Sequence, residues 1–335
     1  MNEKLTQCPL CNNSKGANPF LSCRDELVSH KLFHVEQCRN CGFLYTNPRP
    51  NILNISDYYQ SDEYISHQDK PASMIDKLYL YIRKVMMRRK SRLIRSLIPQ
   101  GSRLLDVGCG TGAFLEAMRH EGYHVQGVEP AETPRKYTQS KGIQVVNDIY
   151  SVFSDRYSEP DILDEDIDSE EDKGFNDPIG FNKKETPQVE ANLFSCITLW
   201  HVLEHMHDFK EQLNRCRQLL TNDGYLIVAL PMYQSLDAAY YKHHWAAYDL
   251  PRHLFHFDNK SFKTAVELSG FTVKKINNLP FDSFYISILS ESYRKRLPKP
   301  IGYLRAFTVG LLSNLAAATG RQPASSQIFI CQKTV

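Results

Sequence analysis

From residue 101 onward, short runs of apolar residues alternate with segments in which apolar residues recur every three or four positions. The runs have the length of buried strands, and the periodic segments have the spacing of helices. Strands are expected at 102–108, 123–130, 143–148, 193–199, 225–231, 271–277 and 326–333, and helices at 112–122, 131–141, 209–224 and 259–269. Strands that alternate with helices form parallel βαβ units, so this pattern predicts an α/β fold with a Rossmann-like, doubly wound sheet.

Two further segments are expected to be helical. Residues 73–97 have helical spacing and carry the basic run "RKVMMRRKSRLIR" (83–95), which is expected on a solvated face, with an RNA-binding face as the alternative. The apolar segment 301–320 contains Arg305 and Asn314, whereas a membrane span needs about 20 mostly apolar residues. We therefore expect a buried or partly amphipathic helix there and no membrane span, with a shallow membrane-surface contact as the alternative.

The chain divides where its pattern changes. Its first segment is polar and cysteine-rich and ends at "TNPRPN" (46–51), where two prolines prevent regular strand pairing. We expect a small domain at 1–50, a helical connector that covers the cofactor site at 51–100, and the α/β domain at 101–335. Within that domain, residues 151–190 form an acidic connection far longer than usual, which predicts a disordered insertion.

Composition and charge limit the function classes. Of the 335 residues, 42% are hydrophobic and 23% are charged, which is typical of a soluble globular protein of enzyme size. The formal net charge of +2 provides no overall field that would attract nucleic acid. The opening "MNEKLTQCPLC" lacks the pattern of a secretory signal, so the nine cysteines indicate free thiols or metal ligands rather than disulfides. A cytoplasmic location is expected.

Two C-x-x-C pairs near the start of the chain predict a metal site. They are formed by Cys8, Cys11, Cys38 and Cys41. Two such turns that face each other commonly bind one structural Zn²⁺ through four thiolates. Asn12 and Gly42 follow the pairs, and both tolerate the left-handed backbone that turns N–H groups toward the sulfur atoms. We expect a zinc ribbon with a small β-rich loop between the pairs and Cys23 as a buried spare thiol; four reduced cysteines without metal are the alternative.

The stretch "LLDVGCGTGAFLEA" (104–117) is the strongest indication of ligand binding. The predicted strand ends near Asp106, and Gly108, Gly110 and Gly112 let the backbone pass close to a ligand before the helix begins. This spacing also fits the loose G-x-G-x-x-A pattern of dinucleotide-binding proteins. The Asp106 carboxylate, however, would repel a pyrophosphate and suits a cationic ligand.

Two more carboxylates follow the next predicted strands. Glu129 ends the second strand, where it can accept hydrogen bonds from both hydroxyls of a ribose. Asp148 follows the third strand, where it can accept a hydrogen bond from an adenine amino group. Together the three acids favour a nucleoside with a cationic centre over a dinucleotide.

The stretch "WHVLEH" contains His201, Glu204 and His205, which match H-x-x-E-H, the inverted zinc-protease motif. Here the motif leaves a sheet strand beside the glycine loop, a context that excludes a protease. A second polar cluster, "HHWAAYDLPRHLFHF" (243–257), follows the fifth predicted strand and includes His253. Ligands of open α/β sheets bind at the carboxyl ends of the strands, so both clusters are expected beside an acceptor pocket.

These motifs carry a family resemblance. "DVGCGTG", the acid that ends the second strand and "LFSCITLWHVLEHMHD" resemble class I S-adenosylmethionine-dependent methyltransferases, from residue 101 to the C-terminus apart from the insertion. "CPLC…CRNCGFLYTNPRP" and "PRHLFHF" are similar to a subgroup in which a zinc ribbon precedes the methyltransferase, including deoxysugar C-methyltransferases. The resemblance implies that S-adenosylmethionine is bound by Asp106, Gly108, Cys109, Gly110, Gly112, Glu129, Asp148 and His201.

The resemblance also implies roles for the histidines. His205 matches the general base of sugar C-methyltransferase relatives, and the other catalytic candidates are Glu204, His201 and His253. In ubiquinone O-methyltransferase relatives a glutamate stands where His201 stands here, and a divalent metal has been associated with that stretch. Proton removal or acceptor hydrogen bonding, packing and capping, and metal binding all stay open. The tyrosine-rich stretch 57–67 either covers the donor or packs in the ordinary way.

The leading hypothesis is a methyltransferase for a small polar metabolite, with a nucleotide-linked sugar among the candidate acceptors. S-adenosylmethionine needs only alignment for an in-line displacement, and a histidine base suits proton removal near neutral pH. One alternative is an RNA methyltransferase that uses the zinc ribbon and the basic helix. Another is a non-enzymatic adaptor that senses a nucleotide. The sequence leaves the acceptor, the methylated atom and the oligomeric state open.

Overall fold

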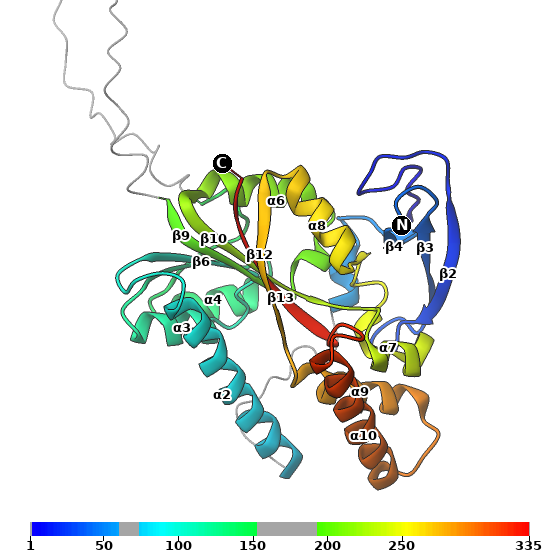
Figure 1. Ribbon diagram of the computed structural model, residues 1–335. Helices are drawn as coiled ribbons and strands as arrows, with labels where there is room; N and C mark the ends of the chain where they lie inside the picture. Colours follow the sequence, from blue (N-terminus) through cyan, green and yellow to red (C-terminus); the bar gives the residue numbers. More distant parts are fainter. Residues whose placement is uncertain (1, 60–73, 153–192, 335) are drawn as a thin grey trace, which may run out of the picture.

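A mixed sheet forms the centre of the molecule (Figure 1). The structure, a computed structural model, describes residues 2–59, 74–152 and 193–334. Across the sheet, the seven strands found in these residues are β12 (Phe271–Asn278), β13 (Ser326–Lys333), β10 (Leu220–Pro231), β9 (Phe194–Trp200), β6 (Arg103–Val107), β7 (His124–Val128) and β8 (Gln144–Val146). Only β13 runs antiparallel to its neighbours. The predicted α/β fold class is confirmed.

Helices cover both faces of this sheet. They are α2 (Met74–Arg95) and α3 (Ala113–His120) on one face and α6 (Phe209–Leu219) and α8 (Asn259–Leu268) on the other (Figure 1). Side chains of a strand alternate between the faces, so Leu104 joins the core under α2 and α3 while Leu105 joins the core under α6 and α8. Between β7 and β8 the chain forms α4 (Glu132–Ser140).

The boundary between the predicted helix 209–224 and the predicted strand 225–231 lies five residues earlier than expected. The helix ends at Leu219, and Leu220 already pairs with Phe194 at the start of β10. The register between β10 and β9 then shifts before Tyr225, so the turn-forming "TNDG" lies within a bulged strand. The helices α7 (Leu236–Tyr241) and α9 (Asp282–Arg294) were not predicted.

The N-terminal region and the α/β region share one sheet. Its order is β11 (Phe255–His256), β4 (Leu44–Thr46), β3 (Leu32–Cys38) and β2 (Ala17–Arg24), beside the short pair β1 (Asn2–Glu3) and β5 (Arg49–Pro50). Strand β11 comes from the "PRHLFHF" segment and pairs with β4 through Phe255 and Tyr45. Phe43 stacks on Phe255 and contacts Phe209 of α6, so one apolar core spans the predicted boundary between the two regions.

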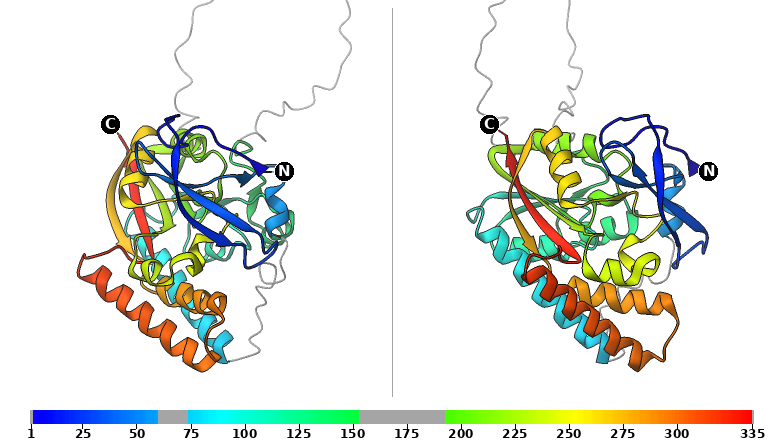
Figure 2. Two further views of the ribbon diagram at one scale, coloured as in Figure 1. Left: turned by 90° about the vertical axis from the view of Figure 1, so that its right-hand side faces the viewer. Right: turned by 45° about the vertical axis from the view of Figure 1, so that its right-hand side comes forward.

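The helices α9 and α10 (Lys299–Ala318) form a pair beyond one end of the sheet (Figure 1). In both views of Figure 2, α10 lies along the outer edge of the molecule. Among the described residues, α10 is the one helix whose length and composition would suffice to cross a membrane, and 33% of its most apolar window is buried. Most of the predicted insertion (153–190) and of the tyrosine-rich stretch (60–67) lies outside the described residues.

Candidate functional site

The loop between β6 and α3 has a backbone that only glycine adopts easily. Gly108 has φ +74°, and a Cβ atom there would lie 2.5 Å from Cγ2 of Val202. Gly110 has φ +53° and faces open space, since no atom lies within 4 Å of where its Cβ would be. Gly112 is the N-cap residue of α3, and the Cys109 side chain is buried. The loop therefore presents bare backbone on its open side, as a closely approaching ligand requires.

Two buried carboxylates flank this loop. Asp106 accepts a hydrogen bond of 2.6 Å from Thr198 Oγ1, and burial raises the pKa of its carboxyl to about 7. Glu129 follows β7 and accepts hydrogen bonds of 2.9 Å from the backbone N–H groups of Gly110 and Ala131. Burial likewise raises the pKa of Glu129. Two carboxyl groups thus lie on two sides of the glycine loop, and a cationic ligand between them would favour their ionised form.

Asp148 has a local role in the described structure. Its carboxylate accepts hydrogen bonds of 2.8 Å from the backbone N–H groups of Tyr150 and Ser151 and from the Ser151 hydroxyl. These contacts close the turn after β8. The contact with adenine expected for Asp148 stays a prediction.

His201 is held between two carboxylates at the end of β9. Its Nδ1 lies 3.6 Å from Glu204 Oε1, and its Nε2 lies 3.2 Å from Asp282 Oδ2 at the start of α9. Burial alone would lower the pKa of His201, but the two carboxylates outweigh it and raise the pKa to about 9. The backbone of His201 is left-handed, with φ +56°, which turns the chain sharply out of the strand. At neutral pH this imidazole is charged.

Glu204 lies at the centre of the cluster. It is fully buried, and within the described part of the chain its carboxylate oxygens accept no hydrogen bond. His253 Nε2 lies 4.0 Å from Oε1. Burial alone would raise the pKa of Glu204, but the histidines around it lower the pKa. Glu204, His205 and His253 place one ligand atom each within 4.8 Å of one another, so they could hold a divalent cation.

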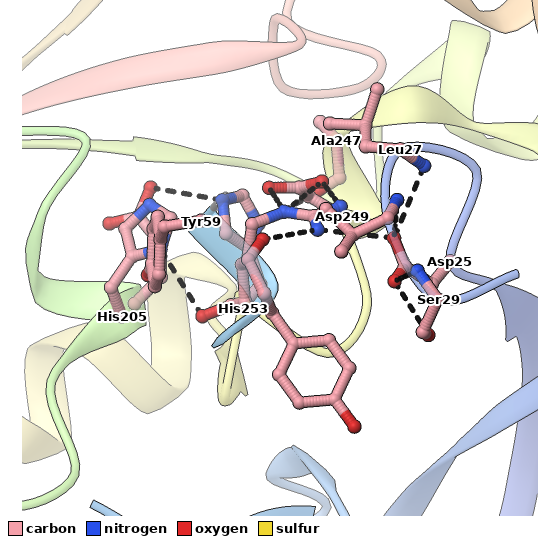
Figure 3. Close-up of polar contacts among 12 residues, drawn as sticks. Asp25, Leu27, Ser29, Tyr59, His205, Ala247, Asp249 and His253 are labelled. Atoms are coloured by element: carbon pink, nitrogen blue, oxygen red, sulfur yellow. Dashed lines mark hydrogen bonds and ion pairs between the residues drawn. The ribbon is translucent and has the colours of Figure 1, made fainter. Parts of the chain in front are cut away.

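His205, unlike His201, is neutral at neutral pH. Burial and the neighbouring His253, whose ring centroid lies 4.5 Å away, lower its pKa to about 4. Its Nδ1 lies 2.9 Å from the Tyr59 hydroxyl and 3.2 Å from the Arg252 carbonyl oxygen (Figure 3). A carbonyl only accepts hydrogen bonds, so the tautomer that satisfies both contacts carries its proton on Nδ1, shared by the Arg252 carbonyl and the Tyr59 hydroxyl oxygen, and leaves a lone pair on Nε2. His205 can therefore accept a proton at neutral pH.

Arg252 ties the loop beside His205 to the N-terminal region. Its buried guanidinium donates hydrogen bonds to both carboxylate oxygens of Asp249, to Asp25 Oδ1 at 3.1 Å and to the Tyr58 carbonyl at 3.0 Å. Asp25 in turn accepts hydrogen bonds from the backbone and hydroxyl of Ser29 (Figure 3). Burial alone would raise the pKa of Asp249, but Arg252 lowers it, so this network is ionised.

Strand β4 holds the same loop from a second direction. Thr46 Oγ1 donates a hydrogen bond of 2.6 Å to the His253 carbonyl, and its backbone N–H donates one of 2.9 Å to the Leu254 carbonyl. The Leu254 N–H then bonds the Glu204 carbonyl at 2.8 Å. His253 Nδ1 bonds the Ala247 carbonyl at 2.9 Å, which fixes its ring. The N-terminal region therefore fixes the positions of all three cluster residues Glu204, His205 and His253.

The four predicted metal ligands lie together. Cys8 Sγ is 3.7 Å from Cys41 Sγ, Cys11 Sγ is 3.7 Å from Cys38 Sγ, and all four sulfur atoms lie within 4.8 Å of one another. Tetrahedral Zn²⁺ with Zn–S bonds of about 2.3 Å would separate its sulfur ligands by about 3.8 Å. The cluster is thus consistent with a zinc site.

The turns around this cluster match the sequence expectation. Asn12 and Gly42 have φ of +57° and +79°, and their N–H groups bond the carbonyls of Cys8 and Cys38. Burial alone would raise the pKa of Cys38, but hydrogen bonds from nearby backbone N–H groups outweigh it and lower the pKa to about 6. Cys23 is buried outside the cluster, as expected.

A family model described as "Methyltransferase domain" (Methyltransf_23) matches residues 79–276, which is more than half of the chain. The chain belongs to this methyltransferase family. The glycine loop and its two acids lie inside the matched segment.

Curated relatives match a shorter segment. The ubiquinone biosynthesis O-methyltransferase of Actinobacillus pleuropneumoniae serotype 5b (strain L20) is 30% identical over 130 residues, which cover 38% of this chain and 44% of the relative. That of Hahella chejuensis (strain KCTC 2396) is 27% identical over 125 residues, 37% of this chain and 41% of the relative. The chain therefore spans less than half the length of these relatives.

Solved structures resemble the chain at low sequence identity. Phosphoethanolamine N-methyltransferase 2 of Haemonchus contortus has a TM-score of 0.46 at 13% identity and covers 87% of this chain and 63% of its own. A SAM-dependent methyltransferase of Archaeoglobus fulgidus has a TM-score of 0.44 at 19% identity, and the match covers 75% of this chain and 94% of that structure's chain. The methyltransferase assignment rests on the family model.

The site includes residues that sequence reasoning missed. Asp282 binds His201 from the unpredicted helix α9, and Asp25 binds Arg252 from the loop after β2. Lys90 was expected on a solvated face of α2, but its ammonium lies 4.3 Å from the ring centroid of Trp200, where Asp106 and Asp282 attract it. A lysine within a run of basic residues gives no signal that it points inward.

Proposed function

We propose that this methyltransferase acts on a small polar metabolite, with a nucleotide-linked sugar as the first candidate acceptor, and that His205 removes the acceptor's proton. The observation that carries the proposal is the state of His205: its pKa is lowered, and its Nδ1 proton is held by the Arg252 carbonyl. A polar acceptor suits the charged groups nearby, since His201 and Asp282 offer a hydrogen-bond donor and an acceptor.

S-adenosylmethionine supplies a methyl group on a positively charged sulfur, which transfers by in-line displacement. The open backbone at Gly110 and the buried acids Asp106 and Glu129 fit the cationic donor. As the acceptor atom bonds the methyl carbon, the carbon–sulfur bond breaks and its electron pair stays on sulfur. The acceptor's proton passes to Nε2 of His205, and the imidazolium that forms is stabilised by the neighbouring Glu204.

We also propose that Cys8, Cys11, Cys38 and Cys41 bind one structural Zn²⁺. The support is the sulfur spacing together with hydrogen bonds to the sulfur atoms. Asn40 donates its backbone N–H to Cys38 Sγ at 3.4 Å and its side-chain amide to Cys11 Sγ at 3.6 Å. Such donors stabilise thiolates and suit a metal ligand.

The donor site is tested by calorimetry with S-adenosylmethionine on the full chain and two variants. Gly110→Ala is expected to weaken binding at least tenfold, because its methyl group enters the open space of the loop. Gly101→Ala is the matched control: Gly101 also has a positive φ and open surroundings, but it lies before β6. Equal losses in both variants would show that backbone strain, not the donor, determines the effect.

The acceptor is tested by incubating the chain and S-adenosylmethionine with a panel of nucleotide-linked sugars and following the mass of each sugar. Methylation of at least one member is expected. Turnover of ribonucleic acid and of no sugar in the panel would overturn the proposed acceptor while leaving the donor site intact.

A further inference from the structure

Helix α10 carries its large apolar side chains on the outside. The outer face of α10 carries six large apolar residues, each between 43% and 68% exposed: Ile301, Leu304, Phe307, Leu311, Leu312 and Leu315. Of these, Phe307 lies at the edge of the face, since its ring also stacks on Phe284 of α9. Soluble proteins normally bury the large apolar side of a surface helix. An exposed stripe of six such residues on one helix therefore needs an explanation.

The side of α10 that faces the protein is small and partly polar. Its buried residues are Gly302, Ala306, Val309, Gly310, Ser313 and Ala317. A Cβ atom at Gly310 would lie 2.8 Å from the Phe284 ring, so α9 and α10 approach closely. Ser313 donates a hydrogen bond of 2.7 Å to the buried Asp237, and Asn314 donates one of 2.8 Å to the Pro280 carbonyl. These contacts fix which side of the helix faces outward.

The charge around the start of α10 is strongly one-sided. Residues 292–335 contain seven Lys and Arg and no Asp or Glu. Lys295 and Arg296, between α9 and α10, and Lys299, the first residue of α10, are exposed. The preceding carboxylate, Glu291, is already bound by Arg305. The exposed cations therefore have no acidic partner within their own segment.

We propose that the outer face of α10 docks this protein on an anionic lipid surface. The helix lies in the plane of that surface, its apolar side chains enter the acyl boundary, and Lys295, Arg296 and Lys299 bind lipid phosphates. Interfacial helices combine an apolar face with basic residues in this way. Ser313 bonds Asp237 of α7, and Asn314 bonds the Pro280 carbonyl just before α9, so these contacts hold α10 against the protein and the helix lies on the membrane without crossing it. In the left view of Figure 2 this helix lies at the outer edge of the molecule.

A second copy of this chain fits the surface less well. Its own 292–335 segment offers only cations and no carboxylate with which to pair Lys295, Arg296 and Lys299. Lipid phosphates supply that negative charge at high density. The proposal does not depend on which acceptor the enzyme methylates.

Flotation with vesicles tests the docking of the full chain. The chain is expected to float with vesicles that contain phosphatidylglycerol, and added salt or pure phosphatidylcholine vesicles are expected to weaken binding. Leu304→Gln, Leu311→Gln and Leu315→Gln together are expected to lower the partition coefficient at least tenfold. Replacing Lys295, Arg296 and Lys299 by Gln is expected to lower it about fivefold for each cation.

The matched control carries the same apolar-to-Gln changes at Ile52, Leu53 and Leu268, which are at least as exposed on average but lie outside α10. This variant is expected to float like the wild type, and all variants should keep the wild-type melting temperature. A wild-type chain that stays unbound on anionic vesicles would overturn the proposal. So would a dimer in light scattering that the α10 changes dissociate, because the face would then bind a second copy.

Discussion

His201 and His205 lie four positions apart, and at neutral pH the first is positively charged and the second is neutral. The pKa of His201 is raised to about 9 by its carboxylate neighbours, whereas burial lowers the pKa of His205 to about 4. Environments that separate the pKa values of two neighbouring groups are typical of acid–base sites. The H-x-x-E-H stretch thus gives one histidine a charge and the other a free lone pair.

Replacing the proposed base removes the proton acceptor and leaves the donor loop intact. His205→Asn is expected to lower kcat about 10²- to 10⁴-fold with little change in the affinity for S-adenosylmethionine. Steady-state kinetics and calorimetry measure the two effects separately. His243→Asn, an exposed histidine of the same segment as His253, is expected to leave kcat unchanged.

The pH profile gives a second test of this base. Since the pKa of His205 is lowered to about 4, it is deprotonated at neutral pH, and kcat should stay level as the pH falls until it approaches that value. A decline in kcat that begins near pH 7 and survives in the His205→Asn variant would assign the titration to another group.

The charge on His201 depends on Asp282. Because the pKa of His201 is raised to about 9, its charge is lost only as the pH rises through that value. The ion pairs of His201 therefore stabilise the fold fully below pH 6.5, the ordinary pKa of histidine, and this stabilisation is lost as the pH rises toward 9. Asp282→Asn removes one carboxylate, and NMR titration of the imidazole is expected to show a lower pKa for His201. Asp223→Asn, at an exposed position of β10, should leave that titration unchanged.

At the scale of elements, the sequence predicted the strands of the central sheet because their apolar runs are bounded by glycines and polar turns. The helix α9 was missed because "FDSFYISILSESYR" buries Ser283, Ser287 and Ser290, so its inner face carries hydroxyls where a periodic apolar pattern was sought. The segment 301–320 was correctly expected to be helical. Its sequence could not show that its small residues face inward and its large ones outward.

The site was predictable only as far as its residues lie in motifs. Cys8, Cys11, Cys38 and Cys41 come together as the C-x-x-C spacing indicates. The link between Asp25 and Arg252, by contrast, joins residues 227 positions apart, and no periodic pattern indicates such a pair.

The Arg252 network is expected to hold the loop that carries His253. Arg252→Met leaves the buried carboxylate of Asp25 and the partly buried carboxylate of Asp249 without their shared cation, which should lower the free energy of unfolding by about 3–5 kcal/mol. Urea denaturation measures this loss. Arg296→Met, at an exposed position, should change it by less than about 0.5 kcal/mol. Replacing Asp25 and Asp249 by Asn alongside Arg252→Met should restore part of the stability.

At the scale of the whole molecule, the four-cysteine cluster supports the cluster of Glu204, His205 and His253, which we propose as the acceptor side of the site. It anchors β3, which pairs with β4, and β4 pairs with β11 beside His253. Metal bound to the thiolates would therefore stabilise a loop far from them in sequence.

Removing one thiolate tests this long-range support. Cys38→Ser is expected to reduce zinc content, measured by mass spectrometry of the metal, from about one ion per chain to a small fraction, since structural zinc needs four ligands. The kcat for the accepted substrate should fall with it. Cys23→Ala, a buried cysteine outside the cluster, should retain the metal. Zinc retained in Cys38→Ser would contradict the proposed ligand set.

The pairing of β11 with β4 has a consequence for how such chains can be recombined. From the sequence alone, residues 1–50 would be treated as an independent domain that can be exchanged between related enzymes by joining the chains at residue 50. In this protein the exchange would also need the matching "PRHLFHF" segment, because that segment supplies β11, the last strand of the sheet. The new N-terminal region would also need a carboxylate at the position of Asp25, because Arg252 would otherwise lose this partner. The two segments should therefore be grafted, and should vary among relatives, as one unit.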